Sequence, residues 1–484
     1  MRFTFKTISF IAASMLSFPL IAQEQLGLRL DNYSGVSGIS INPASNGTAQ
    51  LGWDVNLVGL GVFFNNSLGY IDGASVGKAA SNAMNIGPAD GLDIKKNPNT
   101  TLRFDFYDNL NPKYFSLSTQ IMGPSFVINL KSGHSFGLFT GARFMVSSHD
   151  LPSIFNGYEF QKKKVGETFA VDPFKVTGMA WREVGFNYAY RIGDDSDGSL
   201  TLGANVRSVS AYQAFYANNL TGTNMARISK DSLRFDGLRA EFGATTDLTN
   251  ANRQANTNGS GIGFDIGATL TIPSSDEDKP YDWRLGASIL DMGSVTMTTN
   301  SEVHRLEVKE PYQLMAQKFN NLDPNNQSRD ALERLSRDIT GNPNGTLKSN
   351  TFSMGMPTAI SVQADYAVMK GVFVNGLLMQ RIPVGEHILL RDNLFAITPR
   401  YESRWIGGSL PISIVNWKTT RVGLAARLAF LTIGTDDLGS ILTNGNLTGT
   451  DFYFALKINP FKLGLSGGGS GSSRRGKAQE CYRF

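Results

Sequence analysis

One short pattern in the chain matches the surroundings of an enzymatic nucleophile. Gly133-His134-Ser135-Phe136-Gly137 fits the elbow that exposes a catalytic serine at the end of a strand. A helix must follow that elbow, whereas the apolar alternation continues beyond Gly137 as in a strand. We therefore predict a hairpin turn here and no catalytic residue in the chain. A hydrolase that uses Ser135 is the alternative.

Metal binding has little support from the residues that could act as ligands. The histidines share no metal-like spacing, and they are His134, His149, His304 and His387. Asp194, Asp195 and Asp197 precede Gly198, but their spacing does not fit an EF-hand, and Asp-Gly is typical of tight hairpins. We predict no metal site and no cofactor.

Charged residues of both signs recur on one face of alternating segments. From Thr419 to Pro460, apolar and polar residues alternate with a period of two, which is the period of a β-strand. The same alternation recurs at earlier places along the chain. The charged residues on the polar faces form the candidate site: Glu183, Arg191, Arg207, Asp365, Arg400, Glu402, Arg421, Arg427, Asp451 and Lys457.

Two interpretations of this charged set stay open. The residues could line an aqueous pore and set its selectivity, as charged rings do in channels. They could equally pair with one another and close the interior, because arginine and carboxylate groups form strong two-pronged hydrogen bonds. We favour the closed interior.

The elements that must position these residues are strands with one apolar and one polar face. Val422, Leu424 and Leu428 alternate with Arg421 and Arg427. A further apolar face lies shortly before the tail, at Phe452, Phe454, Leu456 and Ile458. A soluble β-sandwich also alternates, but its inner face would not tolerate this many ionised groups. The pattern predicts an all-β fold, a transmembrane antiparallel β-barrel.

The number of alternating runs between Trp53 and Pro460 predicts the size of the barrel. We expect about 14 strands, because barrels of this class have even counts. Leu102–Phe106 is one of these runs. We expect Thr419–Pro460 to form the terminal hairpin of the barrel.

Three segments interrupt the alternation. Ala74–Ile86 is rich in small residues and predicts a short helix. Ser148–Lys175 predicts a long exposed loop. Residues 302–350 predict a helical loop insert over one barrel mouth, because apolar residues such as Leu332 and Ile339 share one helical face there.

The N-terminal residues predict export. Arg2 and Lys6 precede an apolar run through Ile21, and Ala22 suits a cleavage site, as in a signal peptide. Four parts follow in order: residues 1–22 as signal peptide, 23–52 as a periplasmic or plug-like segment, 53–463 as the barrel, and 464–484 as a flexible basic tail that holds Cys481.

Composition excludes several classes of protein. The 45 basic and 41 acidic residues give a net charge of +4, and such mild basicity on an exported chain argues against nucleic-acid binding. The sequence holds one cysteine, so a disulfide framework within the chain is excluded. Beyond the N-terminal run, the longest apolar stretch is Leu57–Phe64, far below the roughly 20 residues of a transmembrane helix.

Several short motifs resemble an uncharacterised family of Bacteroidota-type outer-membrane β-barrels. Those near the N-terminus are Asn32-Tyr33-Ser34-Gly35-Val36, Ile41-Asn42-Pro43-Ala44 and Trp53-Asp54-Val55-Asn56. Those in the C-terminal half are Thr398-Pro399-Arg400-Tyr401-Glu402-Ser403-Arg404-Trp405, Ser409-Leu410-Pro411, Gly423-Leu424 and Asp451-Phe452-Tyr453. The Asn-Pro-Ala step also resembles the start of FadL-type barrels, which carry hydrophobic solutes, and of PorV-type barrels, which serve protein secretion. The resemblance implies a 14-strand-like barrel with an N-terminal segment inside or beneath it, and no substrate.

These observations together predict a non-enzymatic integral protein of a Gram-negative outer membrane. We expect a channel for small or hydrophobic solutes, or a structural or secretion-associated platform. The expected partners are outer-membrane lipid, the barrel-assembly machinery and a periplasmic or secretion-system protein, with no nucleic acid. The alternatives are a barrel-embedded hydrolase and a soluble secreted β-sandwich that binds a ligand.

Overall fold

The described strands form one closed antiparallel barrel. The computed structural model describes residues 24–459 except 90, 91, 93–98, 195, 196, 230, 231, 247–255, 310, 320, 321 and 323–326. The predicted signal peptide, the tail from residue 464 and Cys481 lie outside the described residues. Within the described part, the barrel has 14 strand positions, as the sequence predicts. Several positions consist of two or three consecutive segments.

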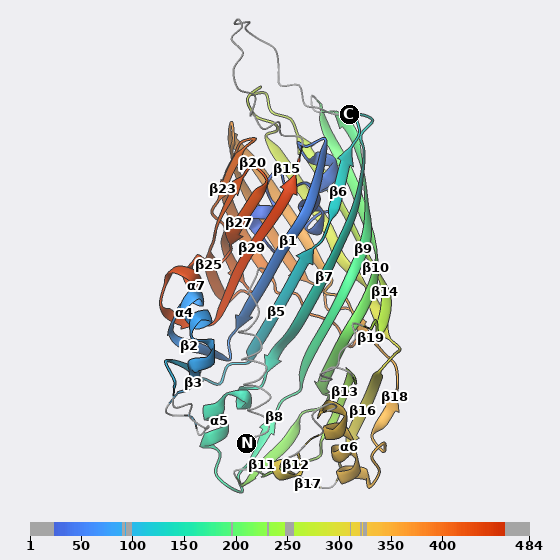
Figure 1. Ribbon diagram of the computed structural model, residues 1–484, viewed down its shortest axis with the longest axis vertical. Helices are drawn as coiled ribbons and strands as arrows, with labels where there is room; N and C mark the ends of the chain where they lie inside the picture. Colours follow the sequence, from blue (N-terminus) through green and yellow to red (C-terminus); the bar gives the residue numbers. More distant parts are fainter. Residues whose placement is uncertain are drawn as a thin grey trace, which may run out of the picture.

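The strand positions follow one another around the barrel nearly in chain order (Figure 1). The first five are β1 (Trp53–Asn66), β5 with β6 (Lys113–Met122, Ser125–Asn129), β7 (His134–Leu151), β9 (Phe174–Asp194) and β10 (Gly198–Asn219). The next three are β13 with β14 (Arg239–Thr245, Gly259–Ile272), β15 with β16 (Trp283–Met297, Ser301–Glu307), and β18 to β20 (Leu347–Ser349, Phe352–Gly355, Ala359–Met369). The last six are β21 (Val372–Arg381), β22 (Leu394–Glu402), β23 with β24 (Ile406–Ser409, Ile412–Val415), β25 with β26 (Thr419–Val422, Leu424–Leu428), β27 (Leu431–Thr435) and β29 (Gly449–Ile458).

The barrel closes because the first strand pairs with the last. β1 and β29 run antiparallel from Val55 opposite Ile458 to Asn65 opposite Gly449. On its other side, β1 pairs with β5 and β6. Both edges of the sheet are thereby satisfied. A two-sheet sandwich, the soluble alternative, is therefore wrong.

Successive side chains of a wall strand point alternately outward and inward, as the period-two pattern predicts. In β9, Val184 is 52% exposed and Phe186 is also exposed, whereas Glu183 is only 4% exposed and Asn187 is buried. In β29, Tyr453 and Lys457 are buried while Leu456 and Ile458 are exposed. Apolar groups thus cover the outside, and the inside holds many buried polar and charged groups.

The two ends of the barrel differ in their connections. At the end from which β29 leaves, short turns join the strands, and we call this the turn end (Figure 1). Gly193 and Gly198 lie on either side of one such turn at φ +89° and +97°, conformations that glycine adopts without strain. The opposite end, the loop end, carries the long connections.

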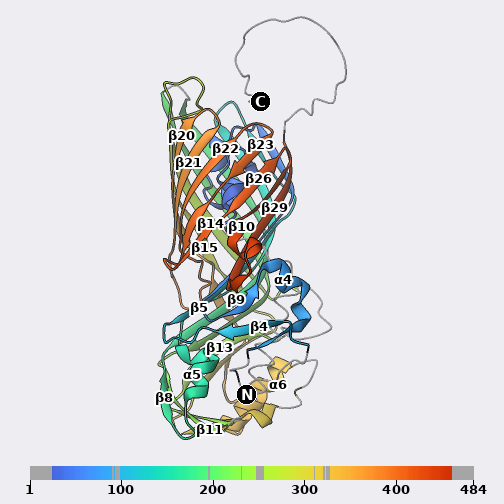
Figure 2. The same cartoon turned by 90° about the vertical axis from the view of Figure 1, so that its left-hand side faces the viewer.

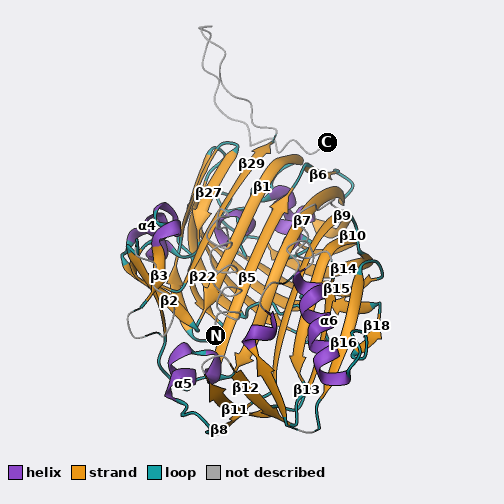
Figure 3. Ribbon diagram, turned by 60° about the horizontal axis from the view of Figure 1, so that its bottom comes forward, coloured by secondary structure: helices purple, strands orange, loops and turns teal. Residues whose placement is uncertain are grey.

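The loops at the loop end carry two small sheets and several short helices (Figures 2 and 3). One sheet contains β2 (Gly69–Ala74), β3 (Ile86–Pro88), β4 (Leu102–Phe106) and β28 (Gly445–Leu447). The other contains β8 (Thr168–Val171), β11 (Thr223–Ser229), β12 (Ser232–Asp236) and β17 (Tyr312–Met315). The helical segments are α4 (Val76–Ser81), η2 (Ala83–Asn85), η3 (Ser153–Phe155), α5 (Gly157–Lys162), η4 (Ala316–Phe319), α6 (Gln327–Thr340) and α7 (Leu438–Leu442).

Some expectations for these loops need correction. Leu102–Phe106 is β4 of the first small sheet and not a barrel strand, although its residues alternate. Residues 302–350 contain the expected helix α6, but also β16 and β18, which extend the barrel wall, and β17 of the second small sheet. Ser148–Lys175, expected as a long exposed loop, includes the end of β7, η3, α5, β8 and the start of β9.

Thr419–Pro460 is not a simple hairpin. β26 turns at Ala429 into β27, which pairs with both β26 and β29. The connection from β27 to β29 then holds α7 and β28. The segment thus supplies three strand positions where two were expected, because β27 is only five residues long and its alternation is too short to stand out.

Residues 24–52 lie inside the barrel, in its half nearer the turn end (Figures 1 and 2). They form α2 (Leu26–Arg29), η1 (Gly35–Ser40) and α3 (Ser45–Thr48), and the chain then enters β1. We call residues 24–50 the plug. Within the described ranges, none of the helices has the length and apolar composition needed to cross a bilayer.

Candidate functional site in the barrel lumen

The plug is held to the surrounding strands by polar contacts that reach several parts of the wall. Asn42 donates from Nδ2 to Thr269 Oγ1 at 3.1 Å, and Asn46 donates to Asn187 Oδ1 at 2.9 Å. Asn205 donates to the carbonyl oxygen of Ile39 at 3.2 Å. Buried polar groups need such partners, and these bonds supply partners to groups of both the plug and the wall.

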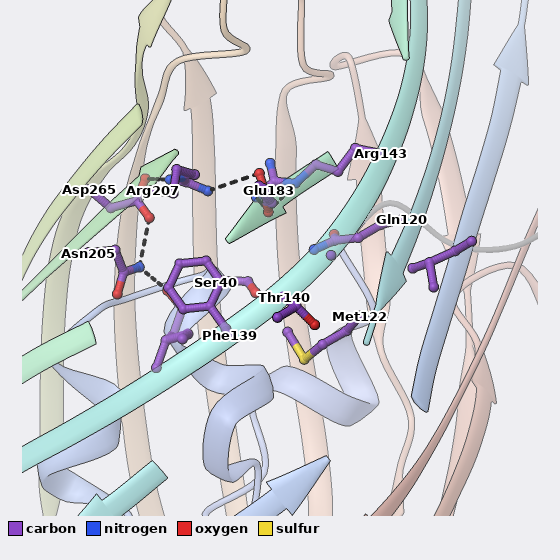
Figure 4. Close-up of a pocket in the computed structure, with 13 residues that line it drawn as sticks. Ser40, Gln120, Met122, Phe139, Thr140, Arg143, Glu183, Asn205, Arg207 and Asp265 are labelled. Carbon is purple, nitrogen blue, oxygen red and sulfur yellow. Dashed lines mark hydrogen bonds and ion pairs between the residues drawn. The ribbon is translucent and has the colours of Figure 1, made fainter. Parts of the chain in front are cut away.

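One cluster of charged side chains crosses the lumen and joins five neighbouring strand positions. We call it the Asp291 cluster, and it consists of Arg143, Glu183, Arg207, Asp265, Asp291 and Arg391. Asp291 receives three arginines: Arg391 at 2.6 Å, Arg143 at 2.9 Å and Arg207 at 3.1 Å. Figure 4 shows Arg143 pointing to Glu183 and Arg207 pointing to Asp265.

A β-bulge brings Asp291 into this cluster. The pairing of β14 with β15 shifts between Phe264 and Ile266, so that Leu290 and Asp291 both turn inward. Asp291 has φ +53°, a left-handed conformation that aspartate adopts more readily than most residues. The bulge thus places a carboxylate where regular alternation would place a side chain on the outside.

A second cluster, the Arg400 cluster, lies where the plug meets β20, β22 and the segment that leads into β15. It consists of Asn32, Tyr281, Asp365, Arg400 and Glu402. Arg400 donates two hydrogen bonds to Asp365, at 2.6 and 2.7 Å, and also pairs with Glu402. Glu402 accepts from the backbone N–H of Asn32 in the plug at 3.2 Å. Every member is buried, so the cluster is a closed polar network.

Two further predicted residues hold the plug directly. Arg427 donates from Nε to Asp31 at 2.7 Å. Lys457 lies 3.6 Å from Asp54 and donates to the carbonyl oxygen of Ser34. These contacts join plug residues to strands near the C-terminal end of the barrel.

Of the remaining predicted residues, Asp451 reaches the plug through one intermediate residue, whereas Arg421 and Arg191 have other surroundings. Asp451 is buried and accepts from the backbone N–H of Asp436, whose carboxylate accepts from the N–H of Leu26 in the plug at 3.1 Å. Arg421 is buried 3.5 Å from Asp437. Arg191 is half-buried beside the turn that follows β9. The predicted set thus falls into several separate contacts and does not form one ring.

Ser135 and the histidines lie elsewhere. Ser135 is buried in β7, which continues as a strand to Leu151, so the strand-to-helix context of a nucleophile elbow is not present at this position. His149 lies 3.5 Å from Asp392, and His304 contacts Thr346 and Glu302. In the part of the chain that the structure describes, no three histidine, cysteine or carboxylate groups gather in a way that could hold a metal.

Two small cavities lie between the plug and the wall. One, of about 50 Å³, is lined by Arg29, Asp31, Arg284 and Asp365 among others. The other, of about 10 Å³, lies beside the Asp291 cluster (Figure 4). A single water needs roughly 10 to 15 Å³, so each has the size of one to a few waters.

A family model matches residues 43–436, and its description is a family of unknown function, DUF5723. This range covers most of the chain. The chain belongs to this family. The resemblance to an uncharacterised barrel family is thereby confirmed. A comparison with curated proteins found no match.

Among solved structures, this member of the DUF5723 family is similar at low identity to two toluene transporters and a FadL homologue. The Ralstonia pickettii toluene transporter TbuX aligns at 12% identity over 88% of this chain and 94% of that chain, with a TM-score of 0.38. The Pseudomonas putida toluene transporter TodX aligns at 11% identity over 89% and 95%, with a TM-score of 0.39. A Pseudomonas aeruginosa FadL homologue aligns at 9% identity over 91% and 98%, with a TM-score of 0.20. Likenesses this distant do not transfer a substrate.

The start of the family match coincides with a close approach between plug and wall. Pro43 and Ala44 lie against Gly203 of β10 and Gly267 of β14, which are paired directly across the sheet. A Cβ atom at Gly203 would clash with the backbone of both plug residues, and one at Gly267 would lie 2.9 Å from Pro43 Cδ. The Asn-Pro-Ala step therefore needs these glycines in order to dock.

We expect Gly203→Val in this DUF5723 protein to loosen the plug. The added side chain meets plug backbone, and overpacking of this kind lowers the free energy of unfolding by about 1 to 3 kcal/mol. The matched control is Gly376→Val in β21, where an added Cβ atom would lie 3.8 Å from its nearest neighbour, the Ala364 carbonyl oxygen. The measurement is the temperature at which the folded band disappears on a gel. Equal temperatures for the two variants would contradict the docking role.

Proposed function

We propose that this protein is a non-enzymatic integral β-barrel of the outer membrane whose own N-terminal segment closes its lumen. In this role it works as a platform that presents the structured loops of the loop end, and not as a freely open pore. The observation that carries the proposal is the plug itself, held by the Asp291 cluster, the Arg400 cluster and the Arg427–Asp31 pair. Charges that pair with one another and with the plug leave the lumen filled.

The outer surface supports insertion into a membrane. The outward side chains of β9 from Val184 to Ile192 are all large, apolar or aromatic, and exposed. A tilted strand needs about 9 to 11 residues to cross the hydrocarbon core, which this run matches. Arg182, the next outward residue toward the loop end, is exposed beside Tyr212. The apolar run therefore ends at a charged boundary.

Aromatic residues near the turn end support the same placement. Trp283 and Tyr366 are both exposed, with ring centroids 4.7 Å apart, and Tyr190 lies 4.7 Å from His134. Aromatic girdles of this kind mark the interface between lipid and water in outer-membrane barrels. Short turns face the periplasm in such barrels, so we place the turn end there and the long loops outside the cell.

The predicted signal peptide at residues 1–22 supports export, after which the barrel-assembly machinery would insert the protein. A platform requires a partner, and we propose a periplasmic or secretion-system protein in that role. The charged residues that contact the plug serve to hold it in place.

A solute channel is the second candidate, and one observation favours it. The lumen half nearer the loop end is lined by a cluster of buried apolar side chains, with methionines prominent among them: Met145, Met179, Met297, Met354 and Met356. Methionine side chains are flexible and adapt to apolar ligands of irregular shape. A hydrophobic solute that displaced these side chains could pass through an apolar part of the lumen from the loop end as far as the plug.

Cell fractionation combined with gel mobility tests the membrane placement. We expect the protein in the outer-membrane fraction, extractable only with detergent, and a band that migrates faster unheated than boiled, because a closed barrel resists the detergent until heated. Recovery as a detergent-free periplasmic protein would contradict the proposal. Electrical conductance across a lipid bilayer separates a closed lumen from a channel.

A further inference from the structure

The loop between β21 and β22 folds back into the lumen. We call residues 382–393 the strap. Its inner part reaches strands that neither β21 nor β22 pairs with: Leu390 N–H donates to Ser147 Oγ of β7 at 2.9 Å, and Thr177 Oγ1 of β9 donates to the carbonyl oxygen of Ile388 at 2.9 Å. Leu389 is 1% exposed in the apolar cluster. The strap therefore crosses the lumen from one wall to another.

The outer part of the strap remains accessible. Val384 is 68% exposed, and Gly385 has φ +113°, a conformation that permits a sharp turn at this tip. Leu389 and residues 391–393 are buried, and Leu390 between them is partly buried. The strap thus has an exposed tip at the loop end and a buried foot inside the barrel.

The foot of the strap meets the plug at Arg391. This side chain, 8% exposed, contacts Asp291 Oδ2 at 2.6 Å and lies 3.7 Å from Glu24 Oε1. Glu24 is the first described residue of the plug, and it also lies 3.6 Å from Arg29 of α2. Arg391 is therefore a shared partner of the barrel wall and of the plug.

Both Glu24 and Arg391 are buried, so the loss of either one would deprive a buried charge of an ionic partner. Removal of Arg391 would leave Glu24 with Arg29 as its one remaining basic partner among the described residues, and would leave Asp291 with one arginine fewer. The buried Glu24 carboxylate would then be less well compensated, which favours a rearrangement that lets water reach it. Glu24, the first described residue of the plug, gains most from such a rearrangement.

We propose that the strap is a latch that controls the plug across the lumen. Displacement of the strap at the loop end withdraws Arg391 from Glu24, and the plug then loosens toward the turn end. This inference rests on the proposed function, because it regulates the same closed lumen. The lumen is then closed by two coupled segments, the plug from the turn end and the strap from the loop end.

A cysteine probe in the plug tests the coupling. The probe is Ser37→Cys, a buried position in η1, in a Cys481→Ser background that removes the natural thiol. The rate of reaction with a water-soluble maleimide reports how often the plug opens. We expect Arg391→Gln to raise this rate at least about fivefold, the lower end of typical coupling between two sites. Glu386→Gln, at the exposed strap tip, is the matched control and should leave the rate unchanged.

A double-mutant cycle separates the latch from general destabilisation. If Glu24 and Arg391 act through their contact, Glu24→Gln added to Arg391→Gln should raise the labelling rate less than the product of the single effects. A variant in which residues 384–390 are replaced by a glycine-serine segment of equal length should also label fast. Folded band mobility on unheated gels confirms that each variant retains its barrel.

The outcomes distinguish the latch from the closed lumen. Slow labelling of the plug probe in all folded variants, strap replacement included, would overturn the latch while leaving the closed lumen intact. Purely multiplicative effects of the two substitutions would overturn coupling through their contact. Fast labelling of the probe in the otherwise unaltered protein would overturn the closed lumen itself.

Discussion

Asp291→Ala is expected to destabilise the barrel more than any other single substitution considered. The change leaves Arg143, Arg207 and Arg391 converging on a site from which their shared carboxylate has gone. Breaking a buried ion pair by removing one partner costs about 3 to 5 kcal/mol. Alanine also tolerates the φ of +53° at this bulge less well than aspartate does. The measurement is the free energy of unfolding in urea, in detergent micelles or lipid vesicles.

Two companion variants separate charge from backbone strain. Asp291→Asn keeps the shape and the tolerance for a left-handed backbone, so its loss of stability reports the charge alone. Asp276→Asn, in an exposed turn, is the control and should stay within about 0.5 kcal/mol of the unaltered protein. If Asp291→Ala were as mild as the control, the Asp291 cluster would not stabilise the lumen.

Removal of residues 24–50 is expected to turn a barrel that carries no steady ionic current into one that conducts. The strand pairing that closes the wall runs from β1 through β29 and involves none of the deleted residues. The side chains of the wall fill a barrel of about 8 strands, and the diameter of a barrel grows with its strand number. A wall of 14 strands without the plug should therefore enclose an aqueous lumen. The deletion should also lower heat stability, because Arg427 and Glu402 lose their plug partners.

The strap provides the comparison for this deletion. Current through the deletion variant should increase when residues 384–390 are also replaced by glycine and serine, because the strap still crosses the other half of the lumen. Gly203→Val retains the whole chain. The current through this variant should lie between that of the intact protein and that of the deletion variant. A folded deletion variant that carried no current would show that the strap and the apolar cluster suffice to close the barrel.

The barrel could be predicted from sequence because its signal is local. Outward residues such as Phe186 and Leu202 alternate with inward residues such as Asn187 and Gly203, and the alternation follows directly from strand geometry. The same geometry places Glu183, Arg207 and Lys457 inside. Arg143 could have been added on this basis, because it follows the same alternation in β7.

Other features depend on contacts between distant parts of the chain. Asp291 enters the lumen through a bulge, and a bulge shifts the alternation by one residue without any marker in the local pattern. Arg391 and Glu24 lie in segments without regular alternation, and they meet only because the strap and the plug enter the lumen from opposite ends. Leu102–Phe106 shows the reverse case, since a small sheet outside the barrel alternates like a membrane strand.

The ion-pair partners of the charged residues could not be predicted from the sequence either. Arg427 and Lys457 are buried, and their partners Asp31 and Asp54 lie near the other end of the chain. Sequence spacing carries no information about such pairs. The choice between a pore lining and a closed interior depends on those partners.

Planar-bilayer recording of the purified intact protein, beside the deletion of residues 24–50, tests the closed lumen most directly. We expect the intact protein to insert without a steady current and the deletion variant to carry one under the same voltage and salt. A steady open-channel current through the intact protein, equal to that of the deletion variant, would contradict a lumen closed by its own N-terminal segment.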